Sequence, residues 1–395
     1  MKPFKTILFL FLFISNPAFS QIHLIDSIKY AKSVKSIETL IDKHQLDVNL
    51  SNSYTTPLVT AANYSDLEMV KMLLRKGAKI NLMAKNINTQ ATPLMTAIRS
   101  RKPKIAELLL EQGADISIQN FYGETALYYA VKKQQMEIIK TLVEKGADLN
   151  IKKSTSWDDI LGQTFNNIWS TTDPSVDSIF YYLVEHGAQL TERHLNIVLR
   201  VNNKPRINFI LSKGIKPSNQ SLHNACHRGD LDLVRRLINE YDLDPLFIKK
   251  NGSTCLHAAI SNYQAYYPDL VKYLLEQKIN VNQANNKQET AFTETFKHLK
   301  GNEAITIGKM LLERGAKINH IESNFNRSAL THAVNHNDLK GIQFLLKNGA
   351  DINLQGDDGE TPLHQAASEN NSTLLLLLKN GANPNIQTDF QMTPL

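Results

Sequence analysis

Two short phrases alternate through most of the chain, and this internal repetition limits the possible folds more than any other feature of the sequence. The first phrase joins glycine and alanine to an aliphatic residue, as in Gly113-Ala114-Asp115-Ile116 and Gly146-Ala147-Asp148-Leu149. The second phrase begins with threonine, as in Thr92-Pro93-Leu94 and Thr361-Pro362-Leu363-His364. Both recur with a period of roughly 33 residues. Such a period predicts a solenoid, in which each repeat packs only on its neighbours.

Each phrase has a physical role in this prediction. Threonine is a good helix N-cap, and proline suits the first helical position because its missing N–H would have no partner there. After the phrase at Thr56, the residues Leu67, Val70, Leu73 and Leu74 fall on one helical face. Gly77 then ends this second helix in a left-handed conformation. Every repeat is therefore predicted to contain two helices followed by a short hairpin.

The phrases resemble the ankyrin repeat family, most closely at Thr361-Pro362-Leu363-His364-Gln365-Ala366-Ala367. The resemblance covers nearly all of the chain beyond residue 20. It implies an all-α fold, an ankyrin-repeat solenoid of stacked helix-turn-helix units joined by β-hairpin loops. It also implies that His223, His257 and His364 hydrogen-bond the backbone of a neighbouring hairpin.

Five segments follow from this division of the chain. We expect a signal peptide at 1–20, a divergent N-terminal capping repeat at 21–53, ankyrin repeats at 54–150, degenerate ankyrin repeats with an insertion at 151–218, and ankyrin repeats at 219–395, the last one incomplete. The 151–218 segment contains Trp157 and Trp169 but no threonine phrase. It is either a distorted repeat with a loop insertion or a specialised contact or hinge.

The N-terminus has the pattern of a secretory signal. Lys2 and Lys5 precede an apolar run at 7–14, and Ala18-Phe19-Ser20 provides small residues before a cut at Gln21. The alternative is an uncleaved membrane anchor, but the run is far shorter than the ~20 residues that span a bilayer. We therefore expect an exported protein, periplasmic or secreted, without membrane insertion after cleavage. Its resemblance to exported ankyrin proteins rich in Lys, Asn and Ile favours a bacterial source.

Composition excludes several classes of function. Apolar residues make up 42% and charged residues 21%, which is ordinary for a globular chain. Loss of two lysines with residues 1–20 lowers the formal net charge from +6 to +4. Because no block or stripe of Lys and Arg stands out, we expect no nucleic-acid partner.

The sequence contains no recognisable catalytic motif. We find no phosphate-binding glycine loop, no His-Glu-x-x-His and no nucleophile elbow, so we expect no enzyme activity, no cofactor and no small-molecule substrate. The pairs His223/His227 and His332/His336 have a spacing that could hold a metal on a helix, but no third ligand is predictable. We therefore predict no metal site.

Two cysteines lie in neighbouring repeats. Five helical positions offset Cys226 from Cys255, which corresponds to about 7.5 Å along the axis, in addition to the spacing between repeats. This separation exceeds the usual limit for a disulfide. We therefore predict two free thiols, one of them buried.

Aromatic residues near the hairpin tips are the candidate protein-binding residues. Tyr122, Phe325 and Phe390 each stand three residues before a threonine or serine that opens a helix. Tyr54 and Phe121 add aromatic surface nearby, and Tyr128 and Tyr129 extend it onto a first helix. Exposed aromatic side chains are favoured interface anchors. The alternative is that each ring folds back onto the next hairpin.

These observations favour a non-catalytic protein–protein interaction scaffold that binds a partner protein through the concave face and hairpin tips of an ankyrin solenoid. The alternative is a secreted effector or toxin component whose active domain lies outside this chain. A third reading, an activity located in 151–218, requires polar side chains that converge in that segment.

Overall fold

The computed structural model describes most of the chain, in two compact parts. The described residues are 17–31, 33–52, 54–84, 90–151, 159–165, 174–262, 266–323, 327–356, 358–369 and 371–394. Contacts divide the chain into Met1–Leu190, here the N-terminal unit, and Thr191–Leu395, here the C-terminal unit. The boundary falls inside the 151–218 segment. All regular elements in the described residues are helical, which confirms the predicted fold class.

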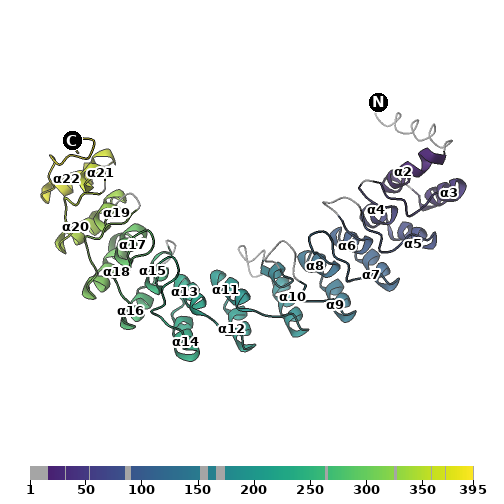
Figure 1. The fold of residues 1–395 in the computed structure, drawn as a ribbon, viewed down its shortest axis with the longest axis horizontal. Helices are drawn as coiled ribbons and strands as arrows, with labels where there is room; N and C mark the ends of the chain where they lie inside the picture. Colours follow the sequence, from purple (N-terminus) through teal and green to yellow (C-terminus); the bar gives the residue numbers. More distant parts are fainter. Residues whose placement is uncertain are drawn as a thin grey trace. The chain divides into compact units, whose positions relative to one another are not determined.

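In the N-terminal unit, helices alternate between two layers (Figure 1). The first helices of successive repeats form one layer: α2 (Pro17–Tyr30), α4 (Pro57–Tyr64), α6 (Pro93–Arg99) and α8 (Ala126–Lys132). The second helices form the other: α3 (Val34–His44), α5 (Leu67–Arg75), α7 (Pro103–Glu111) and α9 (Met136–Glu144). Each first helix packs on the next first helix and on the second helix of its own repeat. The predicted two-helix repeat is therefore present here.

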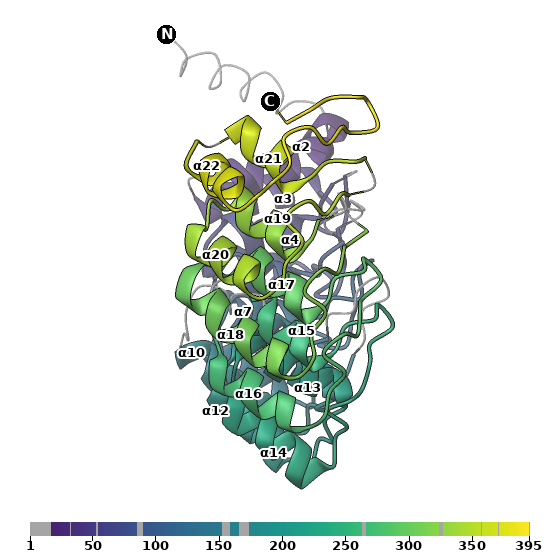
Figure 2. The same ribbon diagram turned by 90° about the vertical axis from the view of Figure 1, so that its left-hand side faces the viewer.

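The C-terminal unit repeats the same arrangement. Its first helices are α11 (Glu192–Val201), α13 (Asn219–Arg228), α15 (Cys255–Ile260), α17 (Ala291–His298), α19 (Ala329–Asn335) and α21 (Pro362–Glu369). Its second helices are α12 (Lys204–Ser212), α14 (Leu231–Tyr241), α16 (Pro268–Glu276), α18 (Gly301–Glu313), α20 (Leu339–Lys347) and α22 (Asn371–Lys379). The long loops that follow the second helices extend from one side of the helices (Figure 2). In each unit, the first helices and the adjoining hairpin tips together form what we call the inner face.

The threonine phrases start the first helices, as predicted. The Thr56 hydroxyl accepts a hydrogen bond from the Val59 N–H at 3.2 Å, and Thr92 accepts one from Met95 N–H at 3.2 Å. Pro57 occupies the first turn of α4, where it displaces no hydrogen bond. These caps satisfy N–H groups that would otherwise be unpaired at a buried helix start.

The core lies between the helix layers. Ala61 and Ala62 of α4 are fully buried and let the neighbouring helices approach closely, while Val70 and Leu73 of α5 are buried at the centre of the predicted apolar face. Met72 is also fully buried, although the sequence pattern did not select it. Each second helix is thus amphipathic because only one side meets the core.

The glycine phrases end the second helices. Gly77 has a φ of +84°, and the Ala78 N–H donates to the Leu73 carbonyl at 3.0 Å. This left-handed closure is the one predicted, and glycine adopts it without a Cβ clash. In one repeat, Lys278 occupies the corresponding position after α16, with a φ of +59°.

Asparagine side chains join the hairpin of one repeat to the glycine phrase of the next. Asn49 donates to the Gly77 carbonyl at 3.0 Å and accepts from the Lys79 N–H at 2.6 Å. Asn282 does the same with Gly315 and Lys317, at 2.9 and 2.8 Å. Asn150 and Asn319 make equivalent pairs of bonds. We call this set the asparagine ladder.

The segment 151–218 departs from the regular repeat, as expected. Where a first helix is due, the described residues form only a short 3-10 helix, η1 (Gly162–Phe165), followed later by α10 (Pro174–Glu185). Phe165 packs against Phe180 with ring centroids 5.6 Å apart. Trp157 and Trp169 lie outside the described residues.

The cysteine predictions are only partly correct. Both Cys226 and Cys255 are free, as predicted. Both are fully buried, whereas the sequence predicted burial for one of them.

The structure describes only the last few residues of the predicted signal peptide. Residues 1–16 of the predicted signal peptide are not described, and Pro17 to Ser20 form the beginning of α2. Among the described helices, none is both long enough and apolar enough to cross a bilayer.

Candidate protein-binding face

Exposed aromatic side chains stand at two hairpin tips of the N-terminal unit. Tyr54 exposes 68% of its surface, Phe121 56% and Tyr122 38%. The rings of Phe121 and Tyr122 meet edge to face, with centroids 5.5 Å apart. For Tyr54 and Phe121, this exposure disagrees with the alternative that the rings fold back onto the next hairpin.

Asparagine side chains fix the backbone beneath these rings. Asn52 Oδ1 accepts from the N–H groups of Tyr54 and Thr55, both at 2.8 Å. Asn120 Oδ1 accepts from Tyr122 N–H and Glu124 N–H, both at 2.9 Å. Because the side-chain amide closes each turn, the aromatic residues are presented from an ordered tip.

Tyr128 and Tyr129 do not extend the exposed aromatic surface. They expose only 6% and 8% of their surfaces, so this part of the prediction is wrong. The Tyr129 hydroxyl donates to Glu124 Oε2 at 2.6 Å, and Asn120 Nδ2 donates to the same hydroxyl at 3.2 Å. Burial and the Glu124 carboxylate raise the pKa of Tyr129. Both rings point into the repeat because they occupy the buried side of α8.

The remaining candidates lie in the C-terminal unit. Phe390 exposes 77% of its surface near the end of the described chain. Phe325 lies outside the described residues. Two of the seven candidates are therefore buried, four are exposed and one is not described.

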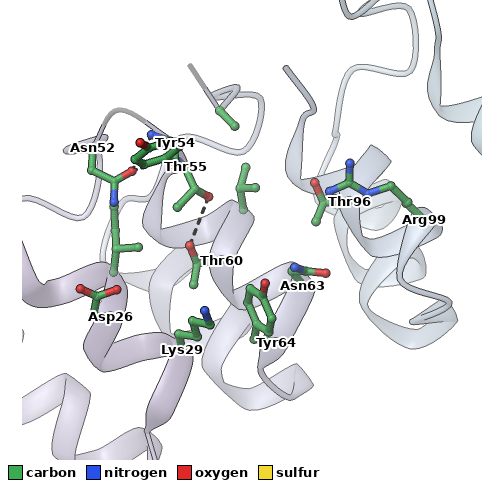
Figure 3. A pocket seen from close by; sticks show the side chains of 13 residues that line it. Asp26, Lys29, Asn52, Tyr54, Thr55, Thr60, Asn63, Tyr64, Thr96 and Arg99 are labelled. Atoms are coloured by element: carbon green, nitrogen blue, oxygen red, sulfur yellow. Dashed lines mark hydrogen bonds between the residues drawn. The ribbon is translucent and has the colours of Figure 1, made fainter. Parts of the chain in front are cut away.

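A cavity of about 360 Å³ opens on the inner face beside Tyr54 (Figure 3). Three consecutive first helices contribute to it: α2 through Lys29, α4 through Tyr64 and α6 through Arg99. The tip residues Tyr54 and Thr55 line it as well, and Thr55 shares a 3.2 Å hydroxyl contact with Thr60. We call this space the inner-face cavity.

Both cations and aromatic rings line the inner-face cavity. Lys29 Nζ lies 5.0 Å from the ring centroid of Tyr64 and 5.1 Å from that of Tyr30, which is cation–π distance. Within the described part of the chain, the Arg99 guanidinium makes no hydrogen bond or ion pair. Asp26 is the acidic residue of the lining. The cavity thus combines two positive charges with apolar ring surface.

Sequence reasoning missed the cavity, Lys29 and Arg99. The residues come from separate repeats, and each looks like an ordinary surface residue in its own helix. One signal was available, because Arg99 and Lys132 hold matching positions near the ends of α6 and α8. A comparison of that position across repeats could have found a basic tendency on this face.

A second group of polar residues is buried on the inner face of the C-terminal unit. Glu289, Glu294, Lys297, Glu322 and His332 form what we call the buried acidic cluster. Lys297 hydrogen-bonds Glu289, and its Nζ lies 3.8 Å from Glu322 Oε2. His332 Nε2 is 3.1 Å from the same Glu322 oxygen. Burial raises the pKa of Glu294 to about 8, with further upward effects from Glu289 and Glu322. Lys297 is partly exposed and the four other groups are buried, so Lys297 alone of this cluster offers surface to a partner protein.

Histidine roles agree with the resemblance. His257 Nε2 lies 3.0 Å from the Glu289 carbonyl, and His364 Nε2 lies 3.1 Å from the Met392 carbonyl. His223 makes a longer contact of 3.4 Å to the Phe247 carbonyl. Within the described ranges, no group of three or more His, Cys, Asp or Glu residues is arranged to hold a metal ion.

The chain matches the family model described as "Ankyrin repeats (3 copies)" over residues 24–120, 82–153, 195–285 and 296–388. The chain belongs to the ankyrin repeat family. Ankyrin repeats commonly mediate protein–protein interaction, and the proteins built from them are generally non-catalytic scaffolds.

Individual relatives share parts of this ankyrin chain. The B-cell lymphoma 3 protein homolog of Mus musculus is 31% identical over 144 residues, which are 34% of this chain and 30% of that protein. The probable 26S proteasome regulatory subunit p28 of Saccharomyces cerevisiae is 30% identical over 163 residues, 40% of this chain and 68% of that protein. The solved ankyrin repeat domain of Bcl-3 aligns with a TM-score of 0.40 and 26% identity, covering 51% of this chain and 91% of the domain. This ankyrin chain therefore spans less than a third of the mouse relative.

Proposed function

We propose that this ankyrin protein is a non-catalytic scaffold that binds a partner protein through the inner face of its N-terminal unit. Membership of the ankyrin repeat family supports a protein partner. One observation favours the N-terminal unit as the binding site: the exposed ring of Tyr54 lines a cavity that is also lined by the positively charged side chains of Lys29 and Arg99. An aromatic anchor beside a pocket is the arrangement expected at the energetic centre of an interface.

The lining suggests which partner group enters the cavity. A volume of about 360 Å³ suits one or two protein side chains rather than a whole helix. Lys29 and Arg99 favour a carboxylate, and Tyr54 and Tyr64 favour an apolar or aromatic neighbour. The proposed partner therefore presents an exposed acidic side chain next to an apolar one.

Affinity capture with the full chain tests this proposal. The captured protein is purified, and its Kd is measured for the wild type and for Tyr54→Ser and Arg99→Ser. We expect each substitution to weaken binding by about tenfold or more, because a hot-spot residue contributes at least about 1–2 kcal/mol. The binding of the wild type should also weaken as salt concentration rises.

Two variants serve as controls for that experiment. Phe390→Ser removes an equally exposed aromatic residue from the C-terminal unit and should leave the Kd unchanged. Tyr129→Phe removes the buried hydroxyl that donates to Glu124 and should lower the melting temperature without changing the Kd. Unchanged binding in both Tyr54→Ser and Arg99→Ser would reject the inner-face cavity as the binding site.

Export is the second part of the proposed function. The described buried residues of α2 that pack on the repeat stack, Leu24, Ile25 and Ile28, all follow the expected cut before Gln21. Removal of residues 1–20 would therefore leave these core contacts in place. N-terminal sequencing of the protein from the exported fraction should begin at Gln21. Recovery of the protein only inside the cell, with Met1 retained, would contradict export.

The alternative is a secreted effector or toxin component whose active domain lies outside this chain. It draws support from the phosphocholine transferase AnkX of Legionella pneumophila, in which a stretch 25% identical to half of this chain makes up 21% of that protein. Sequencing the whole gene distinguishes the two functions. A non-ankyrin domain encoded in the same reading frame would favour the effector.

A further inference from the structure

The hairpin that follows α14 carries an exposed apolar run on the C-terminal unit. Leu246, Phe247 and Ile248 are all exposed. Among the described residues, no other three consecutive positions are all large hydrophobic residues with exposed side chains. Single exposed apolar residues are common, whereas contiguous ones mark interaction surfaces. We call residues 242–250, which contain this run, the hairpin strip.

Leu246 occupies a position that holds an asparagine in the asparagine ladder. Each ladder asparagine stands four residues after the left-handed residue that ends a second helix, as Asn319 does after Gly315. Asp242 is the left-handed residue after α14, with a φ of +52°, so the fourth residue after it is Leu246. Because leucine has no hydrogen-bonding group, this hairpin makes no rung to the next repeat and exposes an apolar side chain instead.

Specific contacts hold the backbone of the hairpin strip in place. Asn219 Oδ1 accepts from the Asp244 N–H at 3.1 Å, and Asp244 Oδ1 accepts from the Leu246 N–H at 2.8 Å. The His223 ring meets the Phe247 ring edge to face, with centroids 6.0 Å apart. The apolar run is therefore presented from an ordered backbone, so that little conformational entropy is lost when another surface covers it.

Charged residues of opposite sign flank the apolar run. Asp242 and Asp244 precede the run. Lys249 and Lys250 follow it, so the strip is acidic, then apolar, then basic along the chain. Within the part of the chain that the structure describes, none of these four side chains forms an ion pair. The next hairpin carries no charged residue over 279–286. The charges of the strip are therefore available to a partner surface.

We propose that the hairpin strip binds the same strip of a second copy of this chain, antiparallel across a two-fold axis. In that arrangement the acidic start of each strip faces the basic end of the other, and the two apolar runs meet at the centre. A two-fold interface requires such a self-complementary surface, because the axis exchanges each residue with its partner residue. A parallel pairing would instead oppose like charges at both ends. The surface lies in the C-terminal unit, so the proposal is independent of the inner-face cavity.

Sedimentation velocity of the full chain over a wide range of concentrations tests the proposal. We expect a reversible monomer–dimer equilibrium with a Kd on the order of micromolar, because one hairpin from each copy buries less area than a standard interface. Dimers should be the largest species, since the two-fold contact uses each strip once. A chain that stays monomeric at every concentration, or that assembles into open-ended oligomers, would overturn the proposal.

Ile248→Lys places a charge in the apolar centre of the strip and should abolish the dimer. The matched control is Leu50→Lys on a hairpin of the N-terminal unit, because Leu50 exposes 44% of its surface and Ile248 exposes 47%. The control should dimerise like the wild type. Since both side chains are exposed, both variants should keep the wild-type melting temperature. A dimer that persists in Ile248→Lys with the wild-type Kd would locate the contact elsewhere and overturn the proposal.

Charge substitutions test the antiparallel direction. The double variant Lys249→Glu, Lys250→Glu makes both ends of the strip acidic and should dimerise about tenfold more weakly than the wild type. Asp242→Lys makes the strip more basic and should also weaken the dimer. Lysine fits that left-handed position, as Lys278 does after α16. A mixture of the two variants should associate more tightly than either alone, because an acidic strip then meets a basic one. Equal affinity in all these samples would reject the antiparallel pairing.

Discussion

At the scale of single residues, the Glu294 carboxyl of the buried acidic cluster is almost completely removed from water. Its Oε2 is buried and has no hydrogen-bond partner among the described residues. Burial raises its pKa to about 8, well above the ordinary value of 4.5. The folded protein therefore prefers the protonated carboxyl. The protonated Glu294 carboxyl therefore contributes to the free energy of unfolding. This contribution is fully present below pH ~4.5, and it is lost as the pH rises toward 8.

Glu294→Gln should remove this pH dependence. The amide is neutral at every pH, so the variant should be more stable than the wild type near pH 8 and similar to it near pH 4.5. One titrating proton changes the free energy of unfolding by up to about 1.4 kcal/mol per pH unit. Urea unfolding of both proteins between pH 5 and pH 8 measures the difference. The exposed Glu303→Gln is the matched control and should follow the wild type at each pH.

Single residues also show where sequence reasoning reached its limit. Threonine phrases located the helix starts, since a cap depends on a residue and its own neighbours. The burial of Tyr128 and Tyr129 was missed, because it depends on the Glu124 and Asn120 side chains that receive the Tyr129 hydroxyl.

At the scale of the element, each second helix ends at a residue that must adopt a left-handed backbone conformation with a positive φ. Gly315 meets it after α18 with a φ of +83°, whereas Lys278 meets it after α16 with a φ of +59°. A side chain in the left-handed region is strained by its Cβ, and glycine is free of this strain. The repeat that ends at Lys278 is therefore less stable than its neighbours at this point.

Lys278→Gly should raise the free energy of unfolding by up to about 1 kcal/mol. Relief of the left-handed strain exceeds the extra flexibility that glycine gives the unfolded chain. Gly315→Lys is the reverse test and should lower stability by a similar amount. Urea midpoints of the two variants and the wild type provide the comparison. A destabilised Lys278→Gly variant would show that the Lys278 side chain makes a stabilising contact that outweighs its strain.

At the scale of the whole molecule, stability is a sum over neighbouring repeats in each unit. The extensive contacts of α4 are with α2, α5 and α6, which are its neighbours in the stack. The repeat period predicted this nearest-neighbour construction from sequence. It did not predict the inner-face cavity, whose lining depends on side chains from three successive first helices and two hairpins.

Leu73→Ala should therefore loosen the protein locally. Leu73 is fully buried in α5, and its truncation should cost about 2–5 kcal/mol. Hydrogen exchange measured by mass spectrometry should become faster in α4, α5 and the adjoining helices, while α17 to α22 keep their wild-type protection. Equal acceleration in both units would contradict construction by neighbouring repeats.

The asparagine ladder has a consequence for how such a chain changes over generations. Each rung uses one side chain of a repeat and the backbone of the following repeat, as Asn282 does with Gly315 and Lys317. The backbone acceptor and donor exist in every copy, whatever side chains that copy carries. Duplication or loss of one whole repeat would therefore leave each remaining rung with a ready partner, so that the protein can lengthen or shorten in steps while its surface residues diverge.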